Sequence, residues 1–161
     1  MRSFPELHEI IEKELADLYY PSTPKNLYDP IKYVLNIGGK RIRPILMLLS
    51  HQLFSEDIEK SLKAALGIEV FHNFTLLHDD IMDKAPLRRG LKTVHEKWDN
   101  NTAILSGDTM LVQAFHLISQ VENKNLRKVL EIFNKASTEV CEGQQWDMDF
   151  EEREDVTLSE Y

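Results

Sequence analysis

The hydrophobic residues of this chain recur every three or four positions, which is the spacing of α-helices, almost from end to end. No run of alternating apolar and polar residues is long enough to predict a convincing strand. We expect helices, in chain order, from Ser3 to about Tyr20, near 27–37, from Pro44 over Ile45–Leu49, from about Ile58 to Asp83 and from Thr93 through Trp98, followed by two long segments. The first long segment aligns Ile104, Leu111, Phe115 and Ile118 on one apolar face, and the second carries Leu126–Val140. The sequence therefore predicts an all-α protein.

The expected helix over 58–83 combines two faces of different chemistry. One face is apolar at core spacing and carries Leu66, Val70, Phe74, Leu77 and Ile81. The other face is polar and carries His72, Thr75, Asp79 and Asp83. Asp79 and Asp83 lie one helical turn apart, where two carboxylates repel each other. A helix that keeps both is either solvated there or binds a cation, and oxygen-only ligands suit Mg²⁺.

At three expected helix starts a Ser or Thr precedes a Glu by three positions, which is the pattern of a helix-capping box. The pairs are Ser3 with Glu6, Thr93 with Glu96, and Thr157 with Glu160. The last start signal has no helix behind it, because the sequence ends at Tyr161, and a first turn is not stable by itself. We therefore expect the chain to be cut short.

Composition and charge restrict the class of protein. A chain of 161 residues with 42% hydrophobic and 29% charged residues suits one soluble domain with a real core. The net charge of −8 argues against nucleic acid as a partner, because phosphate backbones select basic surfaces. The single cysteine, Cys141, cannot form an internal disulfide, and no apolar run is long enough for stable membrane insertion. We expect a cytoplasmic protein.

Two local basic clusters stand against this acidic background. The clusters are Lys40, Arg41 and Arg43, and Arg88, Arg89 and Lys92. A Gly-Gly pair at 38–39 allows a tight turn beside Lys40 and Arg43. Guanidinium groups suit bidentate phosphate binding. Carboxylates, a metal and these cations together describe a diphosphate site, and the plainer alternative is solvated charge that neutralises the aspartates.

Three motifs in these segments resemble, in the same order, those of the trans-isoprenyl diphosphate synthases, the polyprenyl synthetase family. They are GGKRIRP at 38–44, DDIMD followed by RRG within 79–90, and GQQWD at 143–147. The likeness covers essentially the whole chain but only the family's first half. It implies an antiparallel helical bundle of the isoprenoid synthase type, incomplete because the C-terminal helices are absent. Residues 1–161 would then be the N-terminal part of a single domain.

The resemblance implies prenyl transfer. Isopentenyl diphosphate would condense with an allylic prenyl diphosphate (dimethylallyl, geranyl or farnesyl) to give a short-chain trans-prenyl diphosphate. Mg²⁺ held by Asp79 and Asp83 would assist ionisation of the allylic substrate, and Asp79, Asp80, Asp83 and Arg88 would be the catalytic residues. The substrate-binding residues would be Lys40, Arg43, His72, Arg88, Arg89 and Gln144. Arg88 would contact the allylic diphosphate, and Arg89 would contact the isopentenyl diphosphate.

The resemblance also carries expectations for product, assembly and activity. Phe74 and Thr75 would help to form the floor of the product tunnel, and the bulky Phe74 would favour farnesyl or geranylgeranyl diphosphate, although packing is the plainer role for both. Family members are commonly homodimers. Asp147 follows Val140 by seven residues with Gln144 beside it, which predicts a polar-lined cavity or a wet helix end. These residues hold no second DDxxD motif, so we expect the chain alone to turn over little or nothing.

Two other classes of function stay open. A non-catalytic regulatory subunit could keep the fold and modulate a partner synthase, and mixing with a full-length synthase would reveal it through altered product length. Alternatively, His51 with the His78-Asp79 pair resembles an HD-type metal phosphohydrolase. Such a site needs nitrogen and oxygen ligands gathered from several helices, and His78 does not share the helix face of Asp79.

Overall fold

The computed structural model describes residues 1–160 of the chain, and helices dominate them. The elements are α1 Phe4–Ala16, α2 Lys25–Asn36, α3 Ile42–Gln52, α4 Glu59–Met82, β1 Leu87–Arg88, β2 Leu91–Lys92, α5 Val94–Lys97, α6 Asn100–Ile118 and α7 Asn123–Glu151. They fall into two compact units, one spanning Met1–Glu122 and one beginning at Asn123. The prediction of an all-α fold is confirmed, since the described residues contain strands only as the short β1–β2 hairpin.

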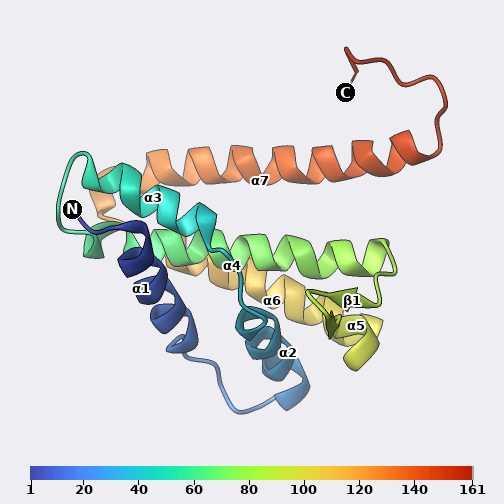
Figure 1. The fold of residues 1–161 in the computed structure, drawn as a ribbon, viewed down its shortest axis with the longest axis horizontal. Helices are drawn as coiled ribbons and strands as arrows, with labels where there is room; N and C mark the ends of the chain where they lie inside the picture. Colours follow the sequence, from blue (N-terminus) through green and yellow to red (C-terminus); the bar gives the residue numbers. More distant parts are fainter. Residues whose placement is uncertain (161) are drawn as a thin grey trace. The chain divides into compact units, whose positions relative to one another are not determined.

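Helix α4 lies at the centre of the first unit and packs along α6, which runs beside it in the opposite direction (Figure 1). Glycine permits close approach at two places in this contact. A Cβ atom on Gly67 of α4 would lie 2.6 Å from Ile118 Cγ1, and a Cβ atom on Gly107 of α6 would overlap the His78 imidazole. Helices α1, α2 and α3 pack around the pair. This packing determines which way each face of α4 points.

The buried face of α4 differs from the expected one in its polar members. Of the five expected apolar residues, Leu66, Val70 and Leu77 are buried. The other two, Phe74 and Ile81, are half-buried. The same face also buries Glu69, Asn73 and Asp80, each only 4% exposed. Val70, Asn73, Leu77 and Asp80 follow one another at steps of three and four residues along the buried face, and Glu69 adjoins Val70. These polar groups are therefore carried inside and need partners there.

The buried face of α6 consists mostly of small residues, and the expected apolar face is partly wrong. Ile118 is buried as expected, but Ile104 and Phe115 are 42% and 36% exposed. The buried positions are Ala103, Ser106, Gly107, Met110, Ala114, Leu117 and Ile118. Small side chains let α6 lie close to α2 and α4. Several larger apolar residues of α6 are therefore left on its outer face.

The first predicted capping box is confirmed at the start of α1. The Ser3 backbone N–H donates to Glu6 Oε2 at 2.7 Å. The helix ends at Ala16, earlier than the expected Tyr20. Pro21 accounts for the last of these positions, because a proline disfavours helical backbone in the residue before it.

The other two capping signals have different outcomes. The predicted box at α5 is wrong, because Thr93 makes no side-chain cap there and its hydroxyl donates to the Ala85 carbonyl at 2.7 Å. This bond ties the start of α5 to the end of α4. In the second unit, the Thr157 N–H does donate to Glu160 Oε2, at 3.0 Å.

The second unit consists of α7 and the turn that follows it. Arg153 in that turn donates to Asp155 and to Glu160, at 3.0 Å in each case. The rings of Trp146 and Phe150 contact each other one helical turn apart. Neither α7 nor any other helix within residues 1–160 combines the length and the apolarity needed to cross a membrane.

Helix α4 ends in a Schellman motif whose left-handed residue is a lysine rather than a glycine. Lys84 has a φ of +51°. Its N–H donates to the Ile81 carbonyl at 3.3 Å, and the Ala85 N–H donates to the Asp80 carbonyl at 2.9 Å. The motif reverses the chain direction and leads it into β1.

Lys84→Gly is expected to raise stability, because glycine adopts left-handed backbone without a steric penalty. The free energy of unfolding should rise by about 1 kcal/mol in urea titrations followed by circular dichroism. The matched control is Lys63→Gly, the same change in the exposed interior of α4, which should lower it by about 1 kcal/mol. Effects of the same sign at both positions would contradict the assignment of strain to Lys84.

Candidate functional site

The segment 38–43, here called the basic turn, joins α2 to the first residues of α3 and passes twice through left-handed backbone. Gly38 has a φ of +83°, and Arg41, the N-cap of α3, has a φ of +48°. Glycine adopts this conformation freely, whereas arginine does so only where its surroundings compensate. The compensation for Arg41 comes from its side chain, which points into the protein interior.

The Arg41 guanidinium is buried between α1 and α4. Its Nε donates to Glu12 Oε1 at 2.7 Å, and its Nη1 donates to Glu69 Oε1 at 2.8 Å. Its Nη2 donates to the Leu35 carbonyl at 2.7 Å. Asn73 also donates to Glu69 Oε1, at 3.1 Å. Burial alone would lower the pKa of Arg41, but the hydrogen bonds to Glu12 and Glu69 outweigh it and raise that pKa.

This network corrects the expectation for Arg41. Its place in the basic cluster suggests a cation for an incoming anion, but its side chain is fully buried and occupied by carboxylates. Its neighbours Lys40 and Arg43 remain exposed. Arg41 therefore anchors the turn, and the flanking cations carry the charge that an anion meets.

Lys40 and Arg43 line an open hollow of about 480 Å³ on the first unit, here called the cationic hollow. Its lining residues are Gly39, Lys40, Arg41, Ile42, Arg43, Glu69, His72 and Arg89. It thus brings together four predicted substrate-binding residues from three separate segments: Lys40, Arg43, His72 and Arg89. Glu69 is the carboxylate in this lining, and Arg41 neutralises it. The hollow therefore presents a net positive surface, which suits phosphate groups.

Arg43 and His72 contact each other in the cationic hollow, with Arg43 Nη1 3.3 Å from His72 Nε2. Because a guanidinium group only donates, a hydrogen bond here requires an unprotonated Nε2. Burial lowers the pKa of His72 most, and the charge of Arg43 lowers it further. Arg89 and Arg88 act in the same direction, against the opposing charge of Glu69. His72 is therefore a neutral hydrogen-bond acceptor at neutral pH.

Arg88 and Arg89 lie on the β1–β2 hairpin, whose two-residue turn is Arg89-Gly90. The φ angles of these turn residues are +53° and +79°, the type I′ pattern that matches the twist of a short hairpin. The paired residues are Leu87 with Lys92 and Arg88 with Leu91. The Tyr33 hydroxyl of α2 donates to the Lys92 carbonyl at 2.7 Å and holds the hairpin from outside.

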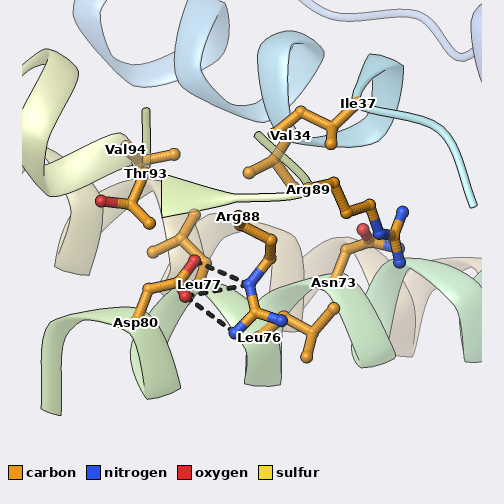
Figure 2. A pocket seen from close by; sticks show the side chains of 10 residues that line it. All are labelled: Val34, Ile37, Asn73, Leu76, Leu77, Asp80, Arg88, Arg89, Thr93 and Val94. Atoms are coloured by element: carbon orange, nitrogen blue, oxygen red, sulfur yellow. Dashed lines mark hydrogen bonds and ion pairs between the residues drawn. The ribbon is translucent and has the colours of Figure 1, made fainter. Parts of the chain in front are cut away.

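The Arg88 side chain leaves the hairpin toward α4 and forms an ion pair with Asp80, whereas Arg89 leaves in a different direction (Figure 2). Arg88 Nε lies 2.9 and 3.0 Å from the two Asp80 oxygens, and Arg88 Nη2 lies 2.7 Å from Oδ1. Arg88 Nη2 also lies 3.5 Å from Asp79 Oδ2. The hydrogen bond to Asp80 is the main cause that raises the pKa of Arg88. Because Asp80 is buried, its carboxylate orients Arg88.

A small cavity of about 10 Å³ lies beneath the hairpin, among the residues drawn in Figure 2. It offers room for roughly one water molecule. A diphosphate does not fit there. The cationic hollow is therefore the part of the first unit with both the room and the charge for such a ligand.

Asp79 and Asp83 lie one turn apart at the end of α4, half-buried and exposed respectively. Within residues 1–160, no group of three or more His, Cys, Asp or Glu side chains is arranged to hold a metal ion. A metal site on this part of the chain would therefore rest on the pair. Two carboxylates suit Mg²⁺, because this ion keeps several of its waters. The metal role of Asp79 and Asp83 stays a prediction.

Phe74 and Thr75, the residues predicted to set product length, are both half-buried on α4. The Phe74 ring centroid lies 4.7 Å from that of His78 and 5.7 Å from that of Phe71. The Thr75 hydroxyl donates to the His72 carbonyl at 2.8 Å. These contacts give both residues a packing role, and their influence on product length stays a prediction.

The GQQWD segment lies on α7, in the second unit. Gln144 is half-buried and Asp147 is exposed. Between them, Gln145 donates to Asp149 at 2.7 Å, one helical turn further on. The substrate-binding role of Gln144 and the polar-lined cavity stay predictions.

The alternative of an HD-type phosphohydrolase finds no support. His51 Nε2 lies 2.9 Å from the Asp57 carbonyl, and His78 Nε2 lies 3.3 Å from the Ile104 carbonyl of α6. Each histidine thus has its own backbone partner. In the part of the chain that the structure describes, they do not join Asp79 in a group of three metal ligands.

Sequence reasoning missed Glu69, and it gave Gly39 only the role of one half of a Gly-Gly turn. A charged residue at core spacing requires a buried partner, so the position of Glu69 was a usable signal for a buried cation such as Arg41. No comparable signal separates Gly39 from Gly38. Only the contact between Gly39 and Arg89 of the hairpin distinguishes the two glycines.

The helical fold has its counterparts among the isoprenoid synthase folds. The chain belongs to the polyprenyl synthetase family: the family model described as Polyprenyl synthetase matches residues 24–161. The match includes the basic turn, the aspartates of α4, the hairpin and the GQQWD segment. The family predicted from the three motifs is therefore confirmed.

Curated relatives support the same assignment. The geranylgeranyl diphosphate synthase of Methanosarcina mazei is 43% identical over 153 residues, which are 94% of this chain and 47% of that protein. The short chain isoprenyl diphosphate synthase of Methanocaldococcus jannaschii is 46% identical over 142 residues, which are 88% of this chain and 43% of that protein. The chain spans about half the length of the curated relatives it matches.

Solved structures show the same relation for the fold. A crystal structure of a geranylgeranyl pyrophosphate synthase matches with a TM-score of 0.96 at 46% identity, over 100% of this chain and 49% of that one. The geranylgeranyl pyrophosphate synthetase of the archaeon Geoglobus acetivorans matches with a TM-score of 0.91 at 40% identity, over 98% of this chain and 52% of that one. The predicted isoprenoid-synthase-type bundle, about half of each matched structure, is therefore confirmed.

Arg41→Ala is expected to lower the free energy of unfolding by about 3–5 kcal/mol, because Glu69 would lose its buried partner. The matched control is Arg43→Ala, an exposed arginine of the same turn, which should change it by less than about 0.5 kcal/mol. Urea titrations followed by circular dichroism measure both. Similar losses for the two variants would contradict the anchoring role of Arg41.

The pKa of His72 is expected to lie below its ordinary value of 6.5 in an NMR titration of the imidazole. Arg43→Ala should raise this pKa, because it removes a neighbouring positive charge, whereas Lys63→Ala on the exposed face of α4 should not move it. Below pH 6.5 the unfolded chain binds more protons at this site than the folded chain. The stability that neutral His72 contributes is therefore present above pH 6.5 and is lost as the pH falls through the lowered pKa. A His72 pKa at or above 6.5 would be the contrary result.

Proposed function

We propose that this protein acts in prenyl transfer, the condensation of isopentenyl diphosphate with an allylic prenyl diphosphate (dimethylallyl, geranyl or farnesyl) to a short-chain trans-prenyl diphosphate. The observation that carries the proposal is the division of charge at the hairpin. Arg89 lines the cationic hollow, and Arg88 lies against the aspartates of α4. A reaction between two diphosphates needs two anion sites next to each other, and this arrangement supports the proposal that the hairpin serves both.

The cationic hollow is the proposed site for isopentenyl diphosphate. Lys40, Arg43 and Arg89 supply fixed positive charge, and hydrogen bonds to charged groups contribute about 1.5–3 kcal/mol each. His72 adds a ring nitrogen. The pKa of His72 is lowered in the free protein. The negative charge of an arriving anion would raise that pKa and favour proton uptake by the ring.

The aspartates and Arg88 form the proposed site for the allylic diphosphate. Asp79 and Asp83 would hold Mg²⁺, which would supply positive charge to neutralise the departing diphosphate. Arg88, oriented by Asp80, would donate hydrogen bonds to the same group. The allylic carbon–oxygen bond breaks, the double bond of isopentenyl diphosphate forms the new carbon–carbon bond, and the departed diphosphate would accept the proton that leaves the isopentenyl unit. The half-buried Phe74 ring would help to keep water from the allylic cation.

We assign a function to two apolar features: the Phe74 ring would limit the length of the product, and the outer face of α6 would form a dimer contact. The Phe74 ring, in contact with Phe71, would limit the growing chain, and relatives named geranylgeranyl diphosphate synthase support a short product. The outer face of α6 would form the contact of a homodimer, and its exposed apolar residues are Ile104, Leu105, Val112 and Phe115. Turnover by the 161-residue chain alone stays predicted as little or none, because α4 supplies only the Asp79–Asp83 pair for a metal.

Calorimetric titration of isopentenyl diphosphate into the chain tests the proposed function. We expect binding by the wild type and a loss of affinity of about 10- to 100-fold for Lys40→Ala and for Arg43→Ala, because each removes a charge-assisted hydrogen bond. The matched control is Lys63→Ala, which removes a lysine from the exposed face of α4 outside the hollow. Unchanged affinity in Lys40→Ala and Arg43→Ala, or an equal loss in Lys63→Ala, would count against the hollow as the site.

A further inference from the structure

We propose that Gly39 is a positioning residue: the absence of a side chain at this position leaves the space in which the Arg89 guanidinium lies. Gly39 would thereby bring Arg89 into the cationic hollow. The proposal rests on the proposed binding of diphosphate in that hollow. Beyond that function, it identifies Gly39 as the residue that determines where the Arg89 guanidinium lies in the hollow.

The contact between the basic turn and the hairpin tip is tighter than any side chain at position 39 would permit. A Cβ atom built on Gly39 would lie 2.7 Å from Arg89 Nη1, 3.2 Å from Nη2 and 3.3 Å from Cζ. All three atoms belong to the planar head of the arginine. Since Cβ atoms essentially never approach other heavy atoms within 3.0 Å, a methyl group here would displace the guanidinium.

The backbone of Gly39 does not itself require glycine. Left-handed φ angles occur in this Gly-Gly pair at Gly38, at +83°, and not at Gly39. The Gly39 carbonyl lies 3.2 Å from His8 Nε2 of α1, a contact that an alanine would retain. Gly38 is therefore needed for its conformation, and Gly39 is needed for the space beside it.

On the hairpin side, the backbone of Arg89 has little freedom to follow a displaced side chain. Arg89 is the first residue of the two-residue turn, and its neighbour Arg88 is held by Asp80. Tyr33 also holds the hairpin, through its bond to Lys92. The flexible Arg89 side chain is thus the part that yields, and its charge would move from its present place in the hollow.

The test compares wild type and Gly39→Ala in calorimetric titrations with inorganic diphosphate, using the 161-residue chain. EDTA removes metal ions, so the titration reports the cationic hollow and not a metal-dependent site. We expect Gly39→Ala to bind about tenfold more weakly, the size of one charge-assisted contact. Its melting temperature should equal or exceed that of the wild type, because alanine restricts the unfolded chain at a compatible backbone position.

A double-mutant cycle separates positioning from a general structural effect. In the Arg89→Ala background, Gly39→Ala should cause no further loss of diphosphate affinity, since the side chain that it displaces is absent. Lys63→Ala, outside the hollow, is the control and should bind as the wild type does.

Each possible outcome has a definite meaning. Absence of diphosphate binding in the wild type would overturn the proposed function of the hollow, and this inference with it. Equal affinity of wild type and Gly39→Ala would overturn the inference alone. A loss in Gly39→Ala that persists in the Arg89→Ala background would also overturn it, because the effect would not pass through Arg89.

Discussion

One buried cation holds the anion-binding surface in place. The Arg41 guanidinium joins α1 through Glu12 and α4 through Glu69, and it keeps its own backbone in a left-handed conformation. If this side chain left the interior, Glu69 would remain as an uncompensated buried charge, which costs several kcal/mol. The turn that carries Lys40 and Arg43 is therefore fixed by the packing of two helices.

The hairpin adds a second constraint, because it separates two consecutive arginines. Arg88 is a strand residue and reaches Asp80 on α4, while Arg89 is a turn residue and reaches the basic turn. Asp80 is buried, so the charge of Arg88 is largely balanced by a carboxylate, whereas Arg89 adds its charge to the hollow. A pair of identical side chains thus serves two different anion sites, as proposed, through backbone geometry alone.

The helices and the gathered cations could be predicted from the sequence because they depend on spacing. The periodicity of α4 and the three motifs led to the fold and to Lys40, Arg43 and Arg89. The residue type alone does not show which of several neighbouring cations turns inward, since this depends on a partner such as Glu69 far away in the chain. The face of α6 was misjudged for a similar reason, because close packing against α4 selects its small residues.

The short turn at Arg89-Gly90 also restricts how this region can vary in evolution. Because side chains alternate along a strand, gain or loss of a single residue there would send the following positions to the opposite side of the hairpin. Such a length change would separate the arginines from their present neighbours while leaving both in the sequence. Both arginines could thus be preserved in the sequence and still be lost to their sites. The length of this loop should therefore stay as constant as the arginines themselves among descendants of the same ancestor.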